Sequence, residues 1–344
     1  MTYIIGEIGQ NHNGSVDIAK VIIDLANKPV VDELFGLELP KMNAVKLTKR
    51  DLSEELTNSQ MSAPYENANS FGKTYGEHRA FLELSDEEHF EVYKYAKSLG
   101  FDFVETLCSI GCLTILDYFT PDYLKVASRD LTNLPLLDAL AATKIPIIVS
   151  TGMAGQKELD HAIETISKYH DKITILHCVS QYPTHPKNVN LRTISYLIEK
   201  YPEYTIGYSD HTIGISAPTA AVALGAQVIE KHITIDRDMK GTDQKGSLGP
   251  EGLWRMIRDI RLMEDSLGRK EIYIEPNTVG AKNKLERSIA TLETLVPGHV
   301  IKEEDLHLLS PGDGIKWVNR DQLVGKTVKN KIDKNELIYL KDVN

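Results

Sequence analysis

The chain has 344 residues, of which 42% are hydrophobic and 26% are charged, and these ordinary values exclude a disordered or fibrous protein. Its formal net charge of −10 argues against non-specific binding to nucleic acid or to an anionic membrane. No stretch approaches the roughly 18 consecutive apolar residues that a membrane-spanning helix needs, so the sequence excludes a membrane protein.

Short apolar segments that end in polar or turn residues recur along the chain, and eight of them are typical of β-strands. They are residues 3–8, 44–47, 101–104, 123–127, 146–149, 173–177, 205–208 and 228–233. Segments with helical periodicity lie between or after them, at residues 16–26, 85–99, 135–142, 156–168, 192–200, 215–224 and 250–266. This alternation predicts an α/β fold in which a closed parallel (β/α)8 TIM barrel occupies residues 1–268. The early glycine-rich fingerprint of a dinucleotide-binding sheet is absent.

Three further segments do not follow the barrel pattern. Residues 27–42 are longer than the usual connection of about 2 to 6 residues, so we interpret them as an insertion. The polar residues 269–285 indicate a linker. Residues 286–344 combine short β-like pieces with turns such as Pro297-Gly298, and they predict a small β-rich domain.

The three cysteines, Cys108, Cys112 and Cys178, are too few and too irregular for a disulfide framework. Met1 leads directly into an apolar strand without the basic start of an export signal. Together these features predict a cytoplasmic protein. The spacing of Cys108 and Cys112 is a weak metal signal with no histidine or cysteine pair nearby, so buried thiols are favoured over a zinc site.

Polar side chains follow every predicted strand, and the active sites of such barrels lie at the C-terminal ends of the strands. In chain order these candidates are Glu7, Asn11, His12 and Asn13, then Lys46, Thr106, Ser128 and Asp130, Ser150 and Thr151, His177 and Tyr182, Ser209, Asp210 and His211, and finally Glu230 and His232. The pattern predicts a polar site to which all eight strands contribute.

Each of these residue types leaves more than one interpretation open. His211 and His232, on neighbouring strand ends, could supply two imidazoles to one divalent ion, but a single histidine is more often a structural hydrogen-bonding residue. Lys46 could neutralise a phosphate or carboxylate, form a Schiff base, or simply reach solvent. Glu230 and Asp243 could be an acid/base pair or solvated carboxylates.

Six strings, in this order, resemble the sialic acid synthase (N-acetylneuraminate synthase) family, which includes legionaminic and pseudaminic acid synthases. They are residues 6–14 (GEIGQNHNG), 72–79 (GKTYGEHR), 150–153 (STGM), 207–211 (GYSDH), 230–237 (EKHITIDR) and 243–250 (DQKGSLGP). The tail resembles the SAF (antifreeze-like, β-clip) domain of the same family. The resemblance therefore covers nearly the whole chain.

The resemblance implies a metal-dependent condensation of phosphoenolpyruvate with an open-chain N-acylated amino sugar, in which C3 of phosphoenolpyruvate attacks the aldehyde and phosphate leaves by C–O cleavage. It implies His211 and His232 as metal ligands, with manganese favoured over magnesium or cobalt. It also implies a domain-swapped homodimer in which each tail closes the partner's site. By similarity Lys46, Thr106, Ser150 and Ser209 contact phosphoenolpyruvate. Glu7, Tyr182, Asp243 and Glu230 surround the sugar and the attacking water.

Several positions differ from the usual family pattern. Ser180 stands where an asparagine is common, and Ser310 stands where bacterial members carry an arginine before the sequence Pro-Gly-x-Gly. With Ser128, these two serines complete the expected substrate-binding set. The acceptor sugar therefore stays open between N-acetylmannosamine, its phosphate and a 2,4-diacetamido sugar. Two competing functions also stay open: another phosphoenolpyruvate-using barrel synthase or aldolase, and a catalytically silent sugar-binding homologue.

Overall fold

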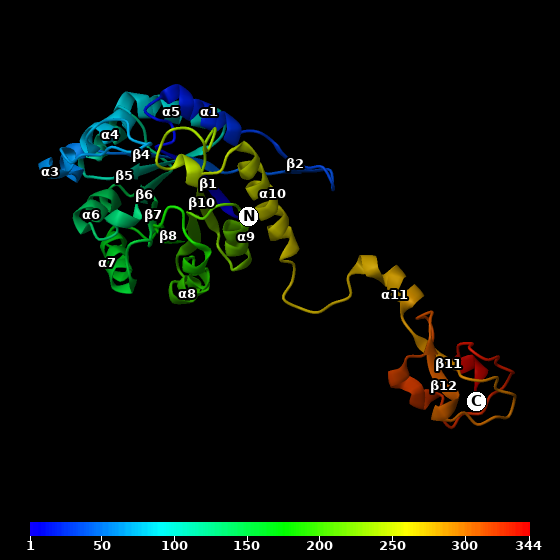
Figure 1. The fold of residues 1–344 in the computed structure, drawn as a ribbon. Coiled ribbons are helices and arrows are strands. Elements are labelled where there is room, and N and C mark those ends of the chain that lie inside the picture. Colours follow the sequence, from blue (N-terminus) through cyan, green and yellow to red (C-terminus); the bar gives the residue numbers. More distant parts are fainter. The chain divides into compact units, whose positions relative to one another are not determined.

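The computed structural model describes all of residues 1–344 and divides them into two compact units, Met1–Gly268 and Arg269–Asn344. The first unit is an eight-stranded parallel barrel surrounded by helices (Figure 1). Its strands are β1 (Tyr3–Gly9), β4 (Ala44–Lys49), β5 (Asp102–Leu107), β6 (Tyr123–Val126), β7 (Ile147–Ser150), β8 (Ile173–Cys178), β9 (Thr205–Asp210) and β10 (Val228–His232). They close in the order β1-β10-β9-β8-β7-β6-β5-β4. The predicted TIM barrel is confirmed, although β5 extends beyond its predicted end.

The helices of the barrel unit include all those that the periodicity predicts. They are α1 (Val16–Ala26), α2 (Leu52–Glu55), α3 (Asn58–Met61), α4 (Tyr75–Leu82), α5 (Asp86–Ser98), α6 (Leu134–Ala142), α7 (Gln156–Ser167), α8 (Arg192–Lys200), α9 (Ser216–Ala223) and α10 (Pro250–Ser266). Helices α2, α3 and α4 were not predicted, because short helices carry too little periodicity to separate them from a loop. A 3-10 helix, Gly111–Asp117, replaces the usual α-helix between β5 and β6.

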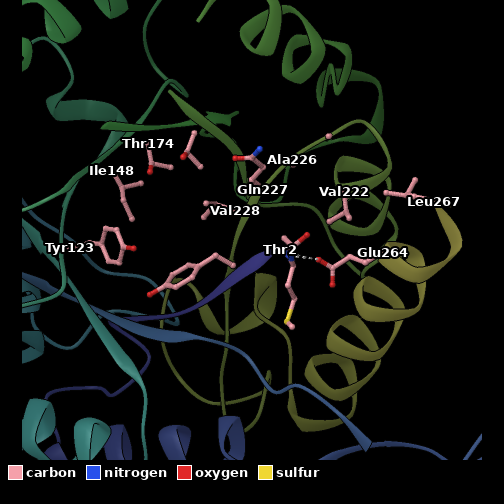
Figure 2. A pocket seen from close by; sticks show the side chains of 14 residues that line it. Thr2, Tyr123, Ile148, Thr174, Val222, Ala226, Gln227, Val228, Glu264 and Leu267 are labelled. Atoms are coloured by element: carbon pink, nitrogen blue, oxygen red, sulfur yellow. Dashed lines mark hydrogen bonds and ion pairs between the residues drawn. The ribbon is translucent and has the colours of Figure 1, made fainter. Parts of the chain in front are cut away.

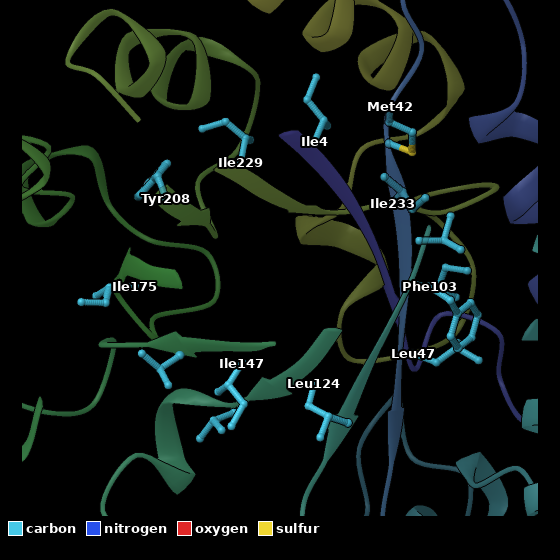
Figure 3. Packing of buried hydrophobic residues seen from close by; sticks show 14 of the residues in the cluster. Ile4, Met42, Leu47, Phe103, Leu124, Ile147, Ile175, Tyr208, Ile229 and Ile233 are labelled. Atoms are coloured by element: carbon cyan, nitrogen blue, oxygen red, sulfur yellow. The ribbon is translucent and has the colours of Figure 1, made fainter. Parts of the chain in front are cut away.

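The main hydrophobic core lies between the barrel and its helices. Strand residues that face outward, such as Ile4, Phe103 and Ile229, pack in this layer (Figure 3). Helix α1 contributes the side chains of Ala19, Ile22, Ile23 and Ala26, which are spaced to form one apolar face, and Ser15 caps its N-terminus. This layer holds the strands in register and so fixes where their inward side chains lie.

The segment 27–42, interpreted from the sequence as an insertion, contains a β-hairpin. Its strands are β2 (Val30–Asp32) and β3 (Leu37–Leu39), which pair antiparallel to each other. The Val30 side chain is fully buried in the main core, whereas Leu34 and Phe35 at the turn are exposed.

The second unit has a hydrophobic core of its own, built around Ile289, Leu323 and Ile338. It begins with the segment predicted as a linker, which contains a 3-10 helix at Pro276–Thr278 and the short helix α11 (Val279–Leu285). Its two-stranded sheet pairs β11 (Ser288–Thr291) with β12 (Leu306–Leu309). Most of the remaining chain is linked by single β-bridges and turns.

Candidate active site at the C-terminal mouth of the barrel

The alternation of side chains along the strands builds the candidate site, because every second residue of a strand faces the barrel axis. The inner layer nearest the strand starts is apolar and consists of Ile5, Ala44, Val104, Ile148, Leu176 and Val228. Two residues further along the same strands stand Glu7, Lys46, Thr106, Ser150, Cys178 and Glu230, all of them buried. A polar layer therefore lies directly above an apolar one, at the C-terminal mouth.

The barrel residues of the predicted catalytic, substrate-binding and metal-ligand set line one cavity at this mouth: Glu7, Lys46, Thr106, Ser128, Ser150, Ser180, Tyr182, Ser209, His211, Glu230, His232 and Asp243. The other strand-end candidates do not line it: Asn11, His12, Asn13, Asp130, Thr151, His177 and Asp210. The cavity has a volume of about 170 Å³. The remaining predicted residue, Ser310, belongs to the second unit, where its hydroxyl donates a hydrogen bond to the Leu285 carbonyl at 2.9 Å.

An ion-paired lysine forms the floor of the cavity. The Lys46 Nζ lies 2.7 Å from a Glu7 carboxylate oxygen and 3.0 Å from Glu230. Burial lowers the pKa of Lys46 to about 8, although the Glu230 charge opposes this shift. Burial alone would raise the pKa of Glu230, but the charges of Lys125 and Lys46 hold it well below its usual range. Lys46 and Glu230 are thus both ionised near neutral pH.

Three basic residues of the cavity escaped the sequence analysis: Lys125, Arg50 and Arg129. Lys125 is 2% exposed, and its Nζ donates to the Val126 carbonyl at 3.1 Å. A lysine inside an otherwise apolar strand was the signal that could have revealed it, because a buried ammonium needs an anionic partner. Arg50 and Arg129 follow β4 and β6, and both contact Glu55 of α2, at 3.0 Å and 2.8 Å.

Two imidazoles lie close together at the mouth, at the ends of β9 and β10. The ring centres of His211 and His232 are 5.7 Å apart, and the Tyr182 ring lies 3.9 Å from His211. The His211 Nδ1 lies 2.9 Å from the Val179 carbonyl. A carbonyl can only accept, so this nitrogen carries the proton, and in the neutral ring Nε2 is left bare. Burial lowers the pKa of His211, but the Cys178 thiol and the Val179 carbonyl outweigh burial and raise it. Burial lowers the pKa of His232 to about 4, which keeps that ring neutral.

Several buried polar atoms of this cavity have no hydrogen-bond partner in the protein. They are Gln10 Nε2, Arg50 Nε, Thr106 Oγ1, Ser150 Oγ and His232 Nδ1. Buried polar groups are nearly always satisfied, and an unpaired one costs about 1 to 3 kcal/mol. Their concentration in one cavity indicates that a polar ligand or water completes it.

A larger cavity of about 560 Å³ lies at the opposite, N-terminal end of the barrel (Figure 2). It is lined by strand-start residues such as Tyr123 and Thr174, and by Glu264, which accepts a hydrogen bond from the Thr2 backbone. None of the unpaired buried atoms lies there. Size alone does not make it the reactive site, because chemistry in these barrels occurs at the C-terminal face.

Cys108 and Cys112 are buried free thiols. Nowhere do three or more His, Cys, Asp or Glu side chains gather closely enough to hold a metal ion by themselves. None of the helices has the length and apolar surface that crossing a lipid bilayer requires.

Comparison with known proteins identifies both units. The NeuB family model matches residues 39–272 and the SAF domain model matches residues 286–344. The chain is 32% identical to the N-acetylneuraminate-9-phosphate synthase of Homo sapiens, over 98% of this chain and 91% of that protein. It is 35% identical to the N,N'-diacetyllegionaminic acid synthase of Legionella pneumophila, over 94% of this chain and 89% of that protein.

Among solved structures, the N-acetylneuraminic acid (sialic acid) synthetase of Leptospira borgpetersenii in complex with citrate is similar, with a TM-score of 0.66 and 29% identity. The similarity covers 81% of this chain and 90% of that one. From the family models, the relatives and the fold together, the chain belongs to the NeuB family and is a synthase with a C-terminal SAF domain.

Proposed function

We propose that the protein condenses phosphoenolpyruvate with an N-acylated amino sugar to give a nonulosonic acid and phosphate. In this reaction C3 of phosphoenolpyruvate bonds to the aldehyde carbon of the open-chain sugar, water adds at C2, and phosphate leaves as its C–O bond breaks. The observation that carries the proposal is the single cavity in which two lysines, two facing imidazoles and several unpaired polar atoms meet. Family membership and the names of the relatives point to the same product class.

The lysine side of the cavity suits phosphoenolpyruvate, which carries a phosphate and a carboxylate. Lys46 and Lys125 supply two buried positive charges, and Thr106, Ser128, Ser150 and Ser209 supply hydroxyl donors around them. Charge-assisted hydrogen bonds of this kind are roughly twice as strong as neutral ones. We assign these residues to the binding of phosphoenolpyruvate.

The imidazole side fits a divalent metal. His211 keeps a bare Nε2, His232 is neutral, and ring centres 5.7 Å apart let both reach one ion, since imidazole nitrogen binds metals at about 2.1 Å. With two protein ligands, positions remain for substrate and water, as a catalytic site requires. When bound, manganese, magnesium or cobalt would act as a Lewis acid on the sugar carbonyl.

We assign the carboxylates of the cavity to orienting the attacking water. Because Glu230 stays ionised, it accepts a hydrogen bond from the attacking water and orients it. The Glu230 carboxylate is itself held by the Ser209 hydroxyl at 2.9 Å. Glu7, Tyr182 and Asp243 line the same cavity, and we assign them to the sugar and to this water.

The lowered pKa of Lys46 favours a second function, that of a Schiff-base aldolase. A lysine that acts as an amine nucleophile needs a lowered pKa of this kind. The two ion pairs of Lys46 weigh against it, since they favour the charged ammonium, which has no free lone pair. Borohydride reduction in the presence of a keto substrate distinguishes the two functions. A mass increase at Lys46 would support the aldolase and contradict the synthase.

The metal assignment is tested with His211→Ala and His232→Ala, with the surface variant His161→Ala as control. We expect both pocket variants to fold and to lose phosphate release, and calorimetric titration with Mn²⁺ to show no specific binding. The control should bind and react like the parent protein. Undiminished Mn²⁺ affinity in both pocket variants would remove the two histidines from the metal site.

The reaction itself is tested by phosphate release from phosphoenolpyruvate with Mn²⁺ across a panel of N-acetylmannosamine, its 6-phosphate and 2,4-diacetamido-trideoxyhexoses. We expect release to depend on one class of sugar, with a product mass equal to that of the matching nonulosonic acid. Phosphoenolpyruvate binding without release for any sugar would contradict the proposed acceptor class. Absence of binding would favour the silent sugar-binding homologue.

A further inference from the structure

The segment 72–79 (GKTYGEHR) belongs to the family pattern, yet none of its residues lines the reactive cavity. It forms helix α4 and the turn before it. Thr74 and Glu77 form a capping box at the helix N-terminus, and Gly76 packs so closely on Met61 that an added Cβ would lie 2.8 Å from the Met61 carbonyl oxygen. These residues explain how the helix is held but not what it does.

The last residue of the segment, Arg79, reaches the cavity through Gln10. The Arg79 Nη1 donates to the Gln10 Oε1 at 2.5 Å. Its other donors, Nε and Nη2, contact the Tyr75 hydroxyl at 2.9 Å and 2.8 Å, and its guanidinium carbon lies 5.0 Å from the centre of the Tyr75 ring. Arg79 is therefore held on two sides and has little freedom to leave Gln10.

This contact fixes the orientation of the Gln10 amide. A guanidinium has donors only, so the amide oxygen must face Arg79 and the amide NH₂ must face away from it. Gln10 lines the cavity, is only 8% exposed, and its Nε2 has no partner in the protein. A buried, oriented and unsatisfied donor is thus presented to whatever fills the cavity.

The position of Gln10 tells which part of the ligand it meets. Gln10 directly follows β1, whose Glu7 pairs with His232 of β10, and a Cβ on the neighbouring Gly9 would lie 3.4 Å from the His232 ring. It therefore stands beside the end of β10 that carries His232, while β4 with Lys46 lies on the other side of β1. The chemistry of the amide decides between these two neighbours. A neutral amide also suits an uncharged oxygen, whereas charged phosphate is matched by the lysines.

We propose that Gln10 is a specificity-determining residue that donates a hydrogen bond from Nε2 to a neutral oxygen of the acceptor sugar, and that Arg79 is the positioning residue that orients it. The inference rests on the proposed function. Through Arg79, helix α4 then contributes to the specificity for the sugar. An acceptor must present a hydroxyl or an acyl carbonyl to the Gln10 amide, because leaving this donor unpaired costs binding energy.

The test compares Gln10→Leu, Arg79→Met and Arg79→Lys with a control on the same segment, Lys73→Met, whose side chain is exposed and outside the cavity. KM values for the sugar and for phosphoenolpyruvate are measured separately, with the sugar that the parent protein uses best. We expect Gln10→Leu to raise the sugar KM about 10-fold, as the loss of one hydrogen bond predicts, and to change the phosphoenolpyruvate KM less than about twofold. Arg79→Met should raise the sugar KM by less, because Gln10 remains but is no longer oriented. Arg79→Lys keeps a donor and should restore most of the loss.

Each outcome bears on one claim. An unchanged sugar KM in Gln10→Leu, or a rise in the phosphoenolpyruvate KM instead, overturns the inference and leaves the proposed function intact. A parent protein that releases no phosphate with any sugar overturns the proposed function and the inference with it. If circular dichroism shows that Gln10→Leu does not fold, the comparison of Arg79→Met with Arg79→Lys decides, since equal sugar KM values in both would contradict the positioning role.

Discussion

Lys46 holds its positive charge between two carboxylates, Glu7 and Glu230, in a place that water hardly reaches. One lysine between two carboxylates leaves an excess of negative charge. The positive charge of Lys125, which also lines the cavity, offsets this excess. An incoming anion therefore meets an ammonium whose position is already fixed. Preorganisation of this kind is how a buried site gains binding energy that surface charges do not provide.

Replacing Lys46 with alanine should weaken phosphoenolpyruvate binding by about 1.5 to 3 kcal/mol, because a buried charge-assisted contact is lost. The exposed Lys172→Ala is the matched control, since it makes the same change in net charge away from the cavity. Calorimetric titration of both variants with phosphoenolpyruvate measures the difference. Equal affinity in both variants would remove Lys46 from the substrate site.

A second residue-scale prediction concerns pH. His12 is 1% exposed, and burial lowers its pKa to about 3. Its Nδ1 accepts a hydrogen bond from the Gly14 backbone at 3.1 Å, which requires an unprotonated nitrogen. The unfolded chain binds a proton below about pH 6.5 and the folded chain does not, so stability is complete above pH 6.5 and falls as the pH drops toward 3.

For this one group the fall between pH 7.5 and pH 5.0 is about 2 kcal/mol. Urea unfolding of the parent protein and of His12→Gln at both pH values isolates it. The variant should be less stable at pH 7.5 and should lose about 2 kcal/mol less than the parent on acidification. Parallel losses in the two proteins would show that His12 does not carry this pH dependence.

Strands β9 and β10 are joined by a buried ion pair on their outer side, opposite to the two histidines that they carry into the cavity. The Lys231 Nζ lies 2.5 Å from Asp210, and both side chains are fully buried. Asp210 also accepts hydrogen bonds from the Tyr208 hydroxyl and the Thr212 backbone. Because Asp210 and Lys231 each precede a metal-ligand candidate, this pair fixes the strand ends from which His211 and His232 project.

We expect Lys231→Met to lower the free energy of unfolding by about 3 to 5 kcal/mol, since it leaves the Asp210 charge buried without its partner. The double variant Asp210→Asn with Lys231→Met removes that charge and should recover part of the loss. Denaturant unfolding of the three proteins measures both changes. A double variant no more stable than Lys231→Met would show that the unpaired charge is not the cause.

At the scale of the whole molecule, the chain consists of two units with separate hydrophobic cores. The small unit exposes apolar side chains, among them Val296, Val300 and Val318. We propose that two chains form a homodimer, as the family resemblance implies.

Size-exclusion chromatography with light scattering should give twice the chain mass of 38.5 kDa at micromolar concentration. Replacing Val318, which is 78% exposed, with aspartate tests whether the small unit contributes. The variant should shift toward the monomer mass, because a charge at an apolar contact is costly. A parent protein with the mass of one chain would contradict the dimer.

The sequence by itself determined the barrel, its strands and most of the residues at its mouth. Strand periodicity is a property of each segment alone, so the inward position of Glu7, Lys46, Thr106 or Glu230 follows from counting along its own strand. Lys125 was not predicted as a site residue, because it lies among apolar residues within its strand. Helix α4 was not predicted either, because it is short.

Only the tertiary structure decided which of these side chains meet. Four contacts join residues that lie between 21 and 184 positions apart and in different elements. They are Lys46 with Glu7, Lys46 with Glu230, Arg79 with Gln10, and Lys231 with Asp210. Such pairs depend on closure of the barrel and on the packing of α4 against it. Local patterns carry no information about them, because the distance between two strand ends is set by the whole core and not by either segment.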